Sequence, residues 1–158
     1  MMERLNLPTY SFNIKSDGTR RLIFDAFRRK WVVLTSEEWV RQHFARYLTE
    51  YKDYPESLIS LEHHIKTGRM NLRCDMLVFS RSGIPVMLVE CKAPDVILSQ
   101  QVFDQAASYY QQVPVLLVVV TNGLTHYCAQ VDQKEKRYVF QTEIPDYEWL
   151  LAQSGRIS

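Results

Sequence analysis

A continuous apolar segment, residues 115–121, limits the possible folds more than any other feature. It reads Val-Leu-Leu-Val-Val-Val-Thr, without a charged side chain and with three consecutive valines. Such a run is typical of a β-strand buried on both faces, because a strand with one solvated face would alternate apolar and polar residues. We therefore expect this segment in the centre of a sheet. Asn122-Gly123 follows directly and predicts a two-residue type I′ turn into a partner strand over residues 124–131.

Two segments carry the periodicity of amphipathic helices. Thr35 or Ser36 can cap a helix that runs to about Tyr51, with apolar residues recurring every three or four positions. Ser99 can cap a second helix that ends near Gln112. Helices interspersed with apolar strands predict an α/β fold.

Further short segments are rich in β-branched and aromatic residues or are bounded by turn residues. We expect strands over residues 21–27, 30–34, 58–65, 73–79, 86–92 and 138–141, and a short helix over residues 145–152. The chain of 158 residues has a length close to the commonest size of a domain. We therefore predict a single domain over residues 1–158.

The composition excludes several classes of protein. Apolar residues make up 46% and charged residues 23%, as in an average globular protein and unlike a disordered one. No segment approaches the roughly 18 to 20 uncharged apolar residues of a membrane span, and residues 1–16 lack a secretory pattern, so we expect a cytoplasmic location. The three cysteines are odd in number and widely spaced, which favours buried hydrophobes over disulfides or a zinc site.

Charge is distributed unevenly, although the formal net charge is only +1. Residues 1–73 contain 13 Lys or Arg against 9 Asp or Glu, whereas residues 74–158 contain 6 against 9. The densest basic cluster consists of Arg20, Arg21, Arg28, Arg29 and Lys30. Arg28, Arg29 and Lys30 are candidates for contact with nucleic-acid phosphates. The alternative is a solvated rim of a β-hairpin.

The most informative pair of strands is residues 73–79 and 86–92. They flank the turn-rich residues 80–85 and therefore predict a β-hairpin. If the turn is centred between positions 82 and 83, the numbers of paired residues add up to 165. This register sets Asp75 directly opposite Glu90, on one face of the sheet.

Three ionisable groups then converge, because Lys92 shares the face of Glu90 in an extended strand. Two facing carboxylates repel each other unless a cation compensates. Magnesium prefers oxygen ligands and accepts one or two carboxylates together with water and phosphate oxygens. Such a metal activates water for attack on a phosphodiester, while Lys92 could orient the water, act as a base or stabilise developing charge. The alternative to a catalytic role is that Glu90 and Lys92 form an ordinary exposed pair on the polar face of a strand.

These residues resemble the PD-(D/E)xK nuclease superfamily, whose core places an Asp and a Glu-x-Lys triplet on adjacent strands. The resemblance implies a restriction-endonuclease-like core, with a mixed central β-sheet flanked by helices. It implies Asp75, Glu90 and Lys92 as catalytic residues. It also implies Mg²⁺ or Mn²⁺ held by Asp75, Glu90 and the backbone carbonyl of Cys91. The chain departs from the family name at one position, because Cys74 replaces the proline.

Other segments resemble a narrower group. Gln105-Ala-Ala-Ser-Tyr109 is similar to the Gln-x-x-x-Tyr motif of the RecB-type branch, which implies supporting roles for Gln105 and Tyr109. Segments 34–42, 88–94 and 120–123 together resemble the N-terminal nuclease domain of type I restriction enzyme R subunits, and this similarity spans about residues 20–130. The resemblance implies that Glu38, or else Glu37, supports the metal site.

We therefore expect a metal-dependent endonuclease that acts on DNA. The chain lacks the Gly-x-x-x-x-Gly-Lys loop of a nucleotide-driven motor, so we expect it to act alone or with a separate helicase or specificity protein. A homodimer is another option, because many nucleases of this kind cut two strands as dimers. The first alternative is a catalytically silent module that binds DNA or a partner protein. The second is a scaffold whose patch from Asp75 to Lys92 is only a solvated salt-bridge surface.

Overall fold

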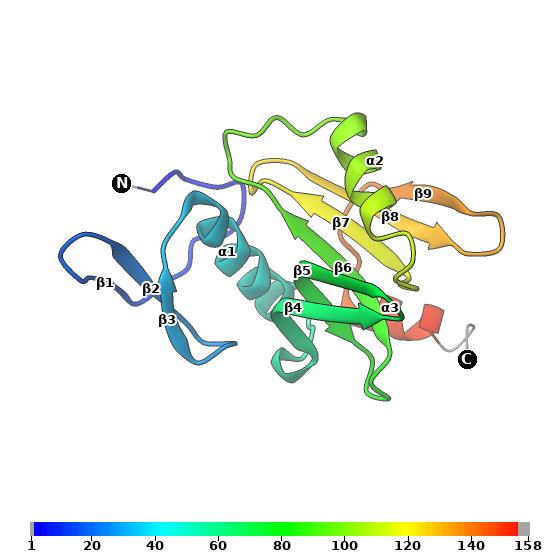
Figure 1. Ribbon diagram of the computed structural model, residues 1–158, viewed down its shortest axis with the longest axis horizontal. Helices are drawn as coiled ribbons and strands as arrows, with labels where there is room; N and C mark the ends of the chain where they lie inside the picture. Colours follow the sequence, from blue (N-terminus) through cyan, green and yellow to red (C-terminus); the bar gives the residue numbers. More distant parts are fainter. Residues whose placement is uncertain (1, 155–158) are drawn as a thin grey trace.

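A computed structural model describes residues 2–154 (Figure 1). In chain order its elements are β1 (Ile14–Ser16), β2 (Arg21–Asp25), β3 (Lys30–Val33), α1 (Ser36–Tyr51), a 3₁₀ turn η1 (Glu56–Leu58), β4 (Ile59–Thr67), β5 (Met70–Phe79), β6 (Pro85–Cys91), α2 (Gln100–Tyr109), β7 (Leu117–Thr121), β8 (His126–Asp132), β9 (Arg137–Gln141) and α3 (Tyr147–Ser154). The fold is thus α/β. Over the described range, no helix is both long and apolar enough to cross a lipid bilayer.

A six-stranded mixed sheet forms the centre of the molecule, in the order β4-β5-β6-β7-β8-β9. Strands β6 and β7 run parallel, and the other neighbouring pairs are antiparallel. All five residues of β7 are buried, which confirms the central, doubly covered strand predicted from its valines. The strand begins at Leu117, two residues later than expected.

Helices cover both faces of this sheet. Helices α1 and α3 lie against one face and α2 lies against the other (Figure 1). The predicted caps are confirmed: the Thr35 hydroxyl accepts a hydrogen bond from the Glu38 amide at 3.0 Å, and the Ser99 hydroxyl accepts one from the Val102 amide at 3.3 Å. Helix α2 ends at Tyr109, three residues before the expected Gln112.

Each face of the sheet has its own hydrophobic core. The core beneath α1 and α3 includes Val40, Phe44, Leu48, Met76, Val89, Leu117, Val119 and Leu150. The core beneath α2 includes Leu77, Leu88, Phe103, Ala107, Val118, Val120 and Ala129. Alternate residues of β7 therefore contribute to opposite cores. Cys74, Cys91 and Cys128 are buried free thiols, as predicted.

A separate three-stranded antiparallel sheet, in the order β1-β2-β3, lies beside α1 (Figure 1). The sequence predicts its hairpin, β2 and β3, but misses β1, which is only three exposed residues long. At the end of β2 the fully buried carboxylate of Asp25 accepts hydrogen bonds from the amides of Phe27 and Arg28, at 2.7 and 3.0 Å. This carboxylate therefore fixes the β2–β3 turn.

The connection between β7 and β8 differs from the predicted two-residue turn. Thr121 pairs with His126, so the loop contains four residues, 122–125. The Asn122 side chain accepts hydrogen bonds from the amides of Leu124 and Thr125, at 2.9 and 2.8 Å. An asparagine that binds its own loop in this way stabilises a wider turn, which explains why the Asn-Gly signal was misleading.

Candidate active site

The predicted register between β5 and β6 is confirmed over the pairs Met76–Val89, Leu77–Leu88 and Val78–Met87. Nearer the turn a bulge changes the register, so that Phe79 pairs with Pro85. At the other end of the ladder, the same register would pair Asp75 with Glu90, but these two residues do not form a backbone pair. Instead, Oδ2 of Asp75 accepts a hydrogen bond from the Cys91 amide at 2.8 Å. The carboxylate therefore occupies the gap where the two strands part.

The pairing of β4 with β5 is interrupted at the same level. The ladder omits Glu62 and Asp75 but pairs the residues on either side of them, Leu61 with Met76 and His63 with Cys74. Glu62 has a φ of 53°, in the left-handed region that a residue with a side chain seldom adopts. Met76 belongs to the α1-side core and Cys74 to the α2-side core. Residues two apart in a regular strand share one face, so the alternation of β5 side chains is broken at Asp75. This distortion presents the Asp75 carboxylate to both layers.

Glu90 and Lys92 lie on the α2 side of the sheet. Lys92 Nζ is 3.9 Å from Glu90 Oε1, and the Lys92 side chain is 37% exposed. Burial, followed by hydrogen bonding to Asp75 and its charge, raises the pKa of Glu90 to about 7. Burial and the neighbouring Asp75 both disfavour the charged form of Glu90, and the charge of Lys92 opposes this shift only in part. Asp75 and Lys92 thus both lie next to the Glu90 carboxylate.

Helix α1 contributes Glu38 to the other side of Asp75. Only 5% of Glu38 is exposed, and its Oε1 accepts hydrogen bonds from Arg28 at 2.7 Å and from Arg41 at 2.6 Å. Arg41 in turn donates to Asp75 Oδ1 at 2.6 Å. Glu38 is therefore separated from Asp75 by one guanidinium. Its neighbour Glu37 is 48% exposed, with Oε1 3.4 Å from Arg41 Nη2.

Two residues of this centre, Arg41 and Glu62, were missed by sequence reasoning. Arg41 lies three residues after Glu38, a spacing that places both on one helix face and could have signalled the pair. Glu62 gave no such signal, because its position depends on the distorted backbone of β4. Its Oε1 lies 2.6 Å from Arg41 Nη2, and its other oxygen forms an ion pair with Arg73.

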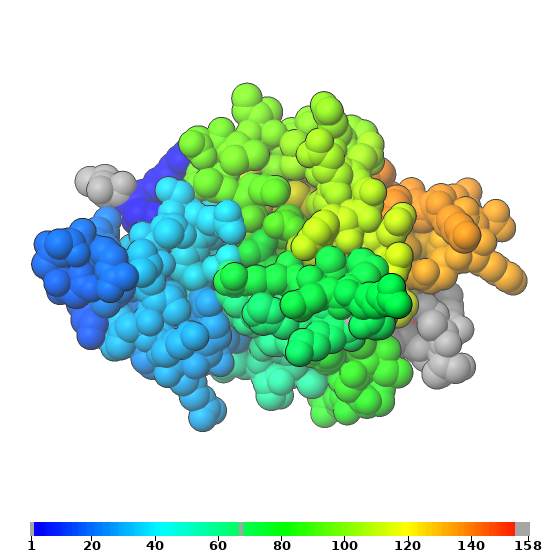
Figure 2. Space-filling model, in the orientation of Figure 1, coloured from blue at the N-terminus to red at the C-terminus, as the bar shows by residue number. Residues whose placement is uncertain are grey.

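A pocket of about 350 Å³ opens beside these groups, between β5, β6 and α2. Its walls include four of the predicted site residues, Glu90, Lys92, Gln105 and Tyr109, together with Arg73, Val102, Ala106 and Tyr110. Figure 2 shows this side of the molecule, where α2 borders the β4–β5 hairpin. The Tyr110 hydroxyl donates to the Arg73 carbonyl at 3.0 Å and so fixes one wall. The pocket gives a ligand direct access to Glu90 and Lys92.

The predicted phosphate-contacting residues differ in their surroundings. Arg28 is 16% exposed and forms ion pairs with Asp25 and Glu38, so its guanidinium is committed inside the protein. Arg29 and Lys30 are exposed at the β2–β3 turn. Of the three, only these two present a charge to solvent.

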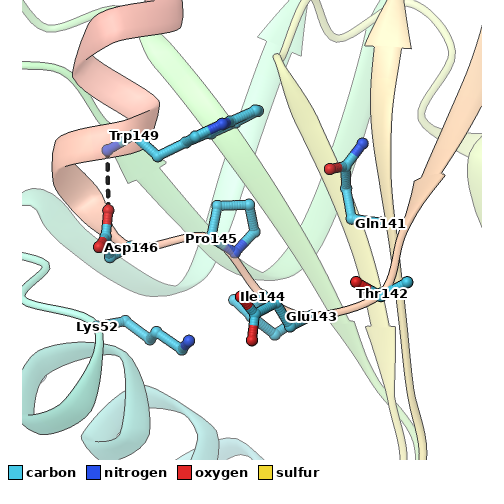
Figure 3. Close-up of a pocket in the computed structure, with 8 residues that line it drawn as sticks. All are labelled: Lys52, Gln141, Thr142, Glu143, Ile144, Pro145, Asp146 and Trp149. Atoms are coloured by element: carbon cyan, nitrogen blue, oxygen red, sulfur yellow. Dashed lines mark hydrogen bonds between the residues drawn. The ribbon is translucent and has the colours of Figure 1, made fainter.

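A second pocket lies elsewhere, between the end of α1 and the connection from β9 to α3 (Figure 3). Lys52, Asp146 and Trp149 are among its lining residues, and Asp146 accepts a hydrogen bond from the Trp149 amide at 2.9 Å. None of the residues predicted from the sequence to carry chemistry lines this pocket.

The donor set of the site matches the chemistry of a hard divalent cation. Asp75, Glu90 and the carbonyl of Cys91 supply oxygen, and Mg²⁺ or Mn²⁺ is commonly held by one or two carboxylates with water completing the shell. Among the described residues, however, no three His, Cys, Asp or Glu side chains are arranged as a preformed metal site. Both oxygens of Asp75 are engaged by protein donors, the Arg41 guanidinium and the Cys91 amide.

A mixed sheet covered by helices on both faces, with acidic groups where two central strands part, defines a restriction-endonuclease-like fold. A sequence model described as type I restriction enzyme R protein N terminus (HSDR_N) matches residues 36–145. The chain belongs to this family.

Comparison with one solved structure agrees with this fold. A fragment of a proposed HsdR subunit of a type I restriction enzyme from Vibrio vulnificus YJ016 superimposes with a TM-score of 0.53 at 19% identity, over 77% of this chain and 25% of that chain. This protein thus spans a quarter of the Vibrio chain. A proposed nuclease belonging to DUF820 from Anabaena variabilis ATCC 29413 has a TM-score of 0.49 at 12% identity, over 87% and 88% of the two chains. No protein of curated function matches the sequence significantly.

Proposed function

We propose that this chain is a metal-dependent nuclease domain that hydrolyses phosphodiester bonds of DNA. The observation that carries the proposal is that Asp75 and Lys92 each lie next to Glu90 where β5 and β6 part, beside a pocket that Gln105 and Tyr109 also line. Membership of the R protein N-terminal family supports the same reaction class and DNA as substrate.

Asp75, Glu90 and the Cys91 carbonyl would hold Mg²⁺ or Mn²⁺. When bound, such an ion supplies a water of lowered pKa and neutralises charge on the phosphate. Lys92 provides a positive charge beside Glu90, where its ammonium group can orient the attacking water and stabilise charge that develops on the phosphate oxygens. The Arg73 side chain, 63% exposed on the same wall, offers a further contact for the phosphate backbone.

Cleavage by purified protein tests the proposal. Supercoiled plasmid and single-stranded DNA are incubated with Mg²⁺ or Mn²⁺, or with a chelator, and the products are separated on gels. Lys92→Met keeps the length of the side chain but removes its charge, and it should reduce the rate by about 10²–10³-fold, as for other groups that stabilise a transition state. Lys134→Met is the matched control, because Lys134 is exposed in the distant β8–β9 turn. Equal cleavage by both variants would refute the assignment.

A second candidate function is binding of DNA or a partner protein without cleavage. The occupation of both Asp75 oxygens by Arg41 and Cys91 favours it, because a metal must compete for this carboxylate. A metal that binds only the folded protein raises its stability, by about 2.7 kcal/mol at a hundredfold excess over the dissociation constant. DNA binding without this shift, and without cleavage, would select the silent module.

The family also suggests the partners. Type I R proteins give the family its name, so we propose a motor or specificity protein as the partner that delivers DNA to this domain. Size-exclusion chromatography with light scattering, with and without DNA, tests whether the chain also forms a homodimer.

A further inference from the structure

Arg41 has an unusual environment for a cation. Its side chain is only 6% exposed and contacts four carboxylates from three elements. Its Nη1 lies 2.6 Å from Glu38, and its Nη2 lies 2.6 Å from Asp75, 2.6 Å from Glu62 and 3.4 Å from Glu37. Burial of a charged side chain is costly unless ionic partners and hydrogen bonds compensate. The burial of Arg41 is thus compensated by the acidic groups themselves.

The carboxylates around Arg41 are also held in place by the fold. Glu62 contacts the guanidinium from a left-handed backbone, at a φ of 53°. Asp75 reaches it because the ladders on both sides of β5 are interrupted at this level. A distortion of two neighbouring strands toward one side chain indicates that Arg41 organises these carboxylates in the protein without metal.

Charge around the centre remains unbalanced even with Arg41 present. The connected side chains comprise six carboxylates (Asp25, Glu37, Glu38, Glu62, Asp75 and Glu90) and four cations (Arg28, Arg41, Arg73 and Lys92). Their formal net charge is therefore −2. This deficit is the charge that one divalent cation would neutralise, but the guanidinium already lies against the Asp75 oxygen that such a cation needs.

We propose that Arg41 is the internal counter-ion of the site, holding Asp75 in the metal-free protein and competing with the divalent cation for it. The inference rests on the proposed metal site and adds to it a residue that sets metal affinity. Because like charges repel, the guanidinium weakens metal binding, and another anion in the pocket, such as a DNA phosphate, would offset this repulsion.

The test measures metal binding without any substrate. Mn²⁺ is titrated calorimetrically into wild type and into Arg41→Met, a variant of similar length without charge. Removal of the guanidinium should tighten Mn²⁺ binding at least tenfold. It should also lower the melting temperature in chelator and enlarge the metal-induced rise in melting temperature. A residue with only a structural role would lower the melting temperature and leave the dissociation constant unchanged.

A second pair of variants protects the test against misfolding. Arg41→Met leaves several buried carboxylates without their cation, and Glu62→Gln removes the charge of one of them. The single variant Glu62→Gln is therefore compared with the double variant Arg41→Met/Glu62→Gln. The double variant should again bind Mn²⁺ at least tenfold more tightly than Glu62→Gln. An unchanged or weaker affinity would overturn the role of Arg41 as competitor while leaving the proposed nuclease intact. Absence of Mn²⁺ binding in every variant would overturn both.

Discussion

His43 illustrates how a single buried side chain couples this fold to pH. It is 4% exposed, and its Nδ1 donates to the Trp39 carbonyl at 2.9 Å. Its ring lies against Trp39 and Phe12, with centroids 4.2 and 4.9 Å apart. Burial lowers the pKa of His43 below the usual value, although the hydrogen bond to Trp39 opposes the shift. The folded protein therefore resists protonation of this ring.

Stability should consequently decrease as the pH falls below about 6.5, because the unfolded chain then binds a proton that the folded chain refuses. One such group contributes a slope of at most about 1.4 kcal/mol per pH unit. Urea unfolding at pH 7, 6 and 5 should show this decrease in wild type and a shallower one in His43→Phe. His64→Phe is the control, since His64 is exposed. A wild-type slope in His43→Phe would contradict the prediction.

At the scale of elements, two hairpin loops each contain a glycine with a positive φ angle. The two glycines differ in whether a neighbouring side chain would contact an added Cβ. Gly83 and Gly123 have nearly equal φ angles, 83° and 84°. A Cβ on Gly83 would meet nothing within 4 Å, whereas one on Gly123 would lie 2.7 Å from Cδ2 of Leu5. The backbone of Gly123 also accepts a hydrogen bond from the Asn6 amide at 2.8 Å, so the β7–β8 loop anchors the N-terminal segment.

Gly83→Ala should therefore lower the free energy of unfolding by about 1 kcal/mol through strain alone. Gly123→Ala should lower the free energy of unfolding by roughly 1 kcal/mol more than Gly83→Ala does, because Leu5 must move from its buried position. Chemical denaturation measures both changes. In a Leu5→Ala background the additional loss should disappear, as a double-mutant cycle would reveal. Equal effects of the two glycine substitutions would show that the Leu5 contact is unimportant.

At the scale of the whole molecule, one sheet serves two cores. Phe44 of α1 and Phe103 of α2 are both fully buried, but they lie on opposite faces. Alternate residues of β7, Val119 and Val118, contact one core each. Loss of either core would expose one face of the same strands, so the two layers should unfold together.

Phe44→Leu and Phe103→Leu should each lower the stability by about 1–2 kcal/mol, because a smaller side chain leaves a cavity. Circular dichroism and tryptophan fluorescence should report the same single transition in both variants. Tyr51→Leu, at a position 60% exposed, should change stability by no more than about 0.5 kcal/mol. Transitions that separate in Phe103→Leu would show instead that α2 unfolds independently.

Local patterns in the sequence determined much of this architecture. The valines of β7 predicted a doubly buried strand, and Thr35 predicted the start of α1. The turn before β6 predicted the register that brings Asp75 level with Glu90. These features depend on side-chain periodicity and on short-range hydrogen bonds, which neighbouring residues largely decide.

Tertiary structure alone decided how the acidic centre is completed. Arg41 meets Asp75 across 34 positions of the chain, and Glu62 joins them only through a left-handed residue in an interrupted ladder. The β7–β8 loop is likewise longer than the Asn-Gly sequence predicts, because the Asn122 side chain accepts hydrogen bonds from the loop amides. No local periodicity encodes such contacts, because their geometry follows from the way a helix and three strands are packed together. The sequence therefore determined the strands that carry the site, and the packing determined which charges face one another there.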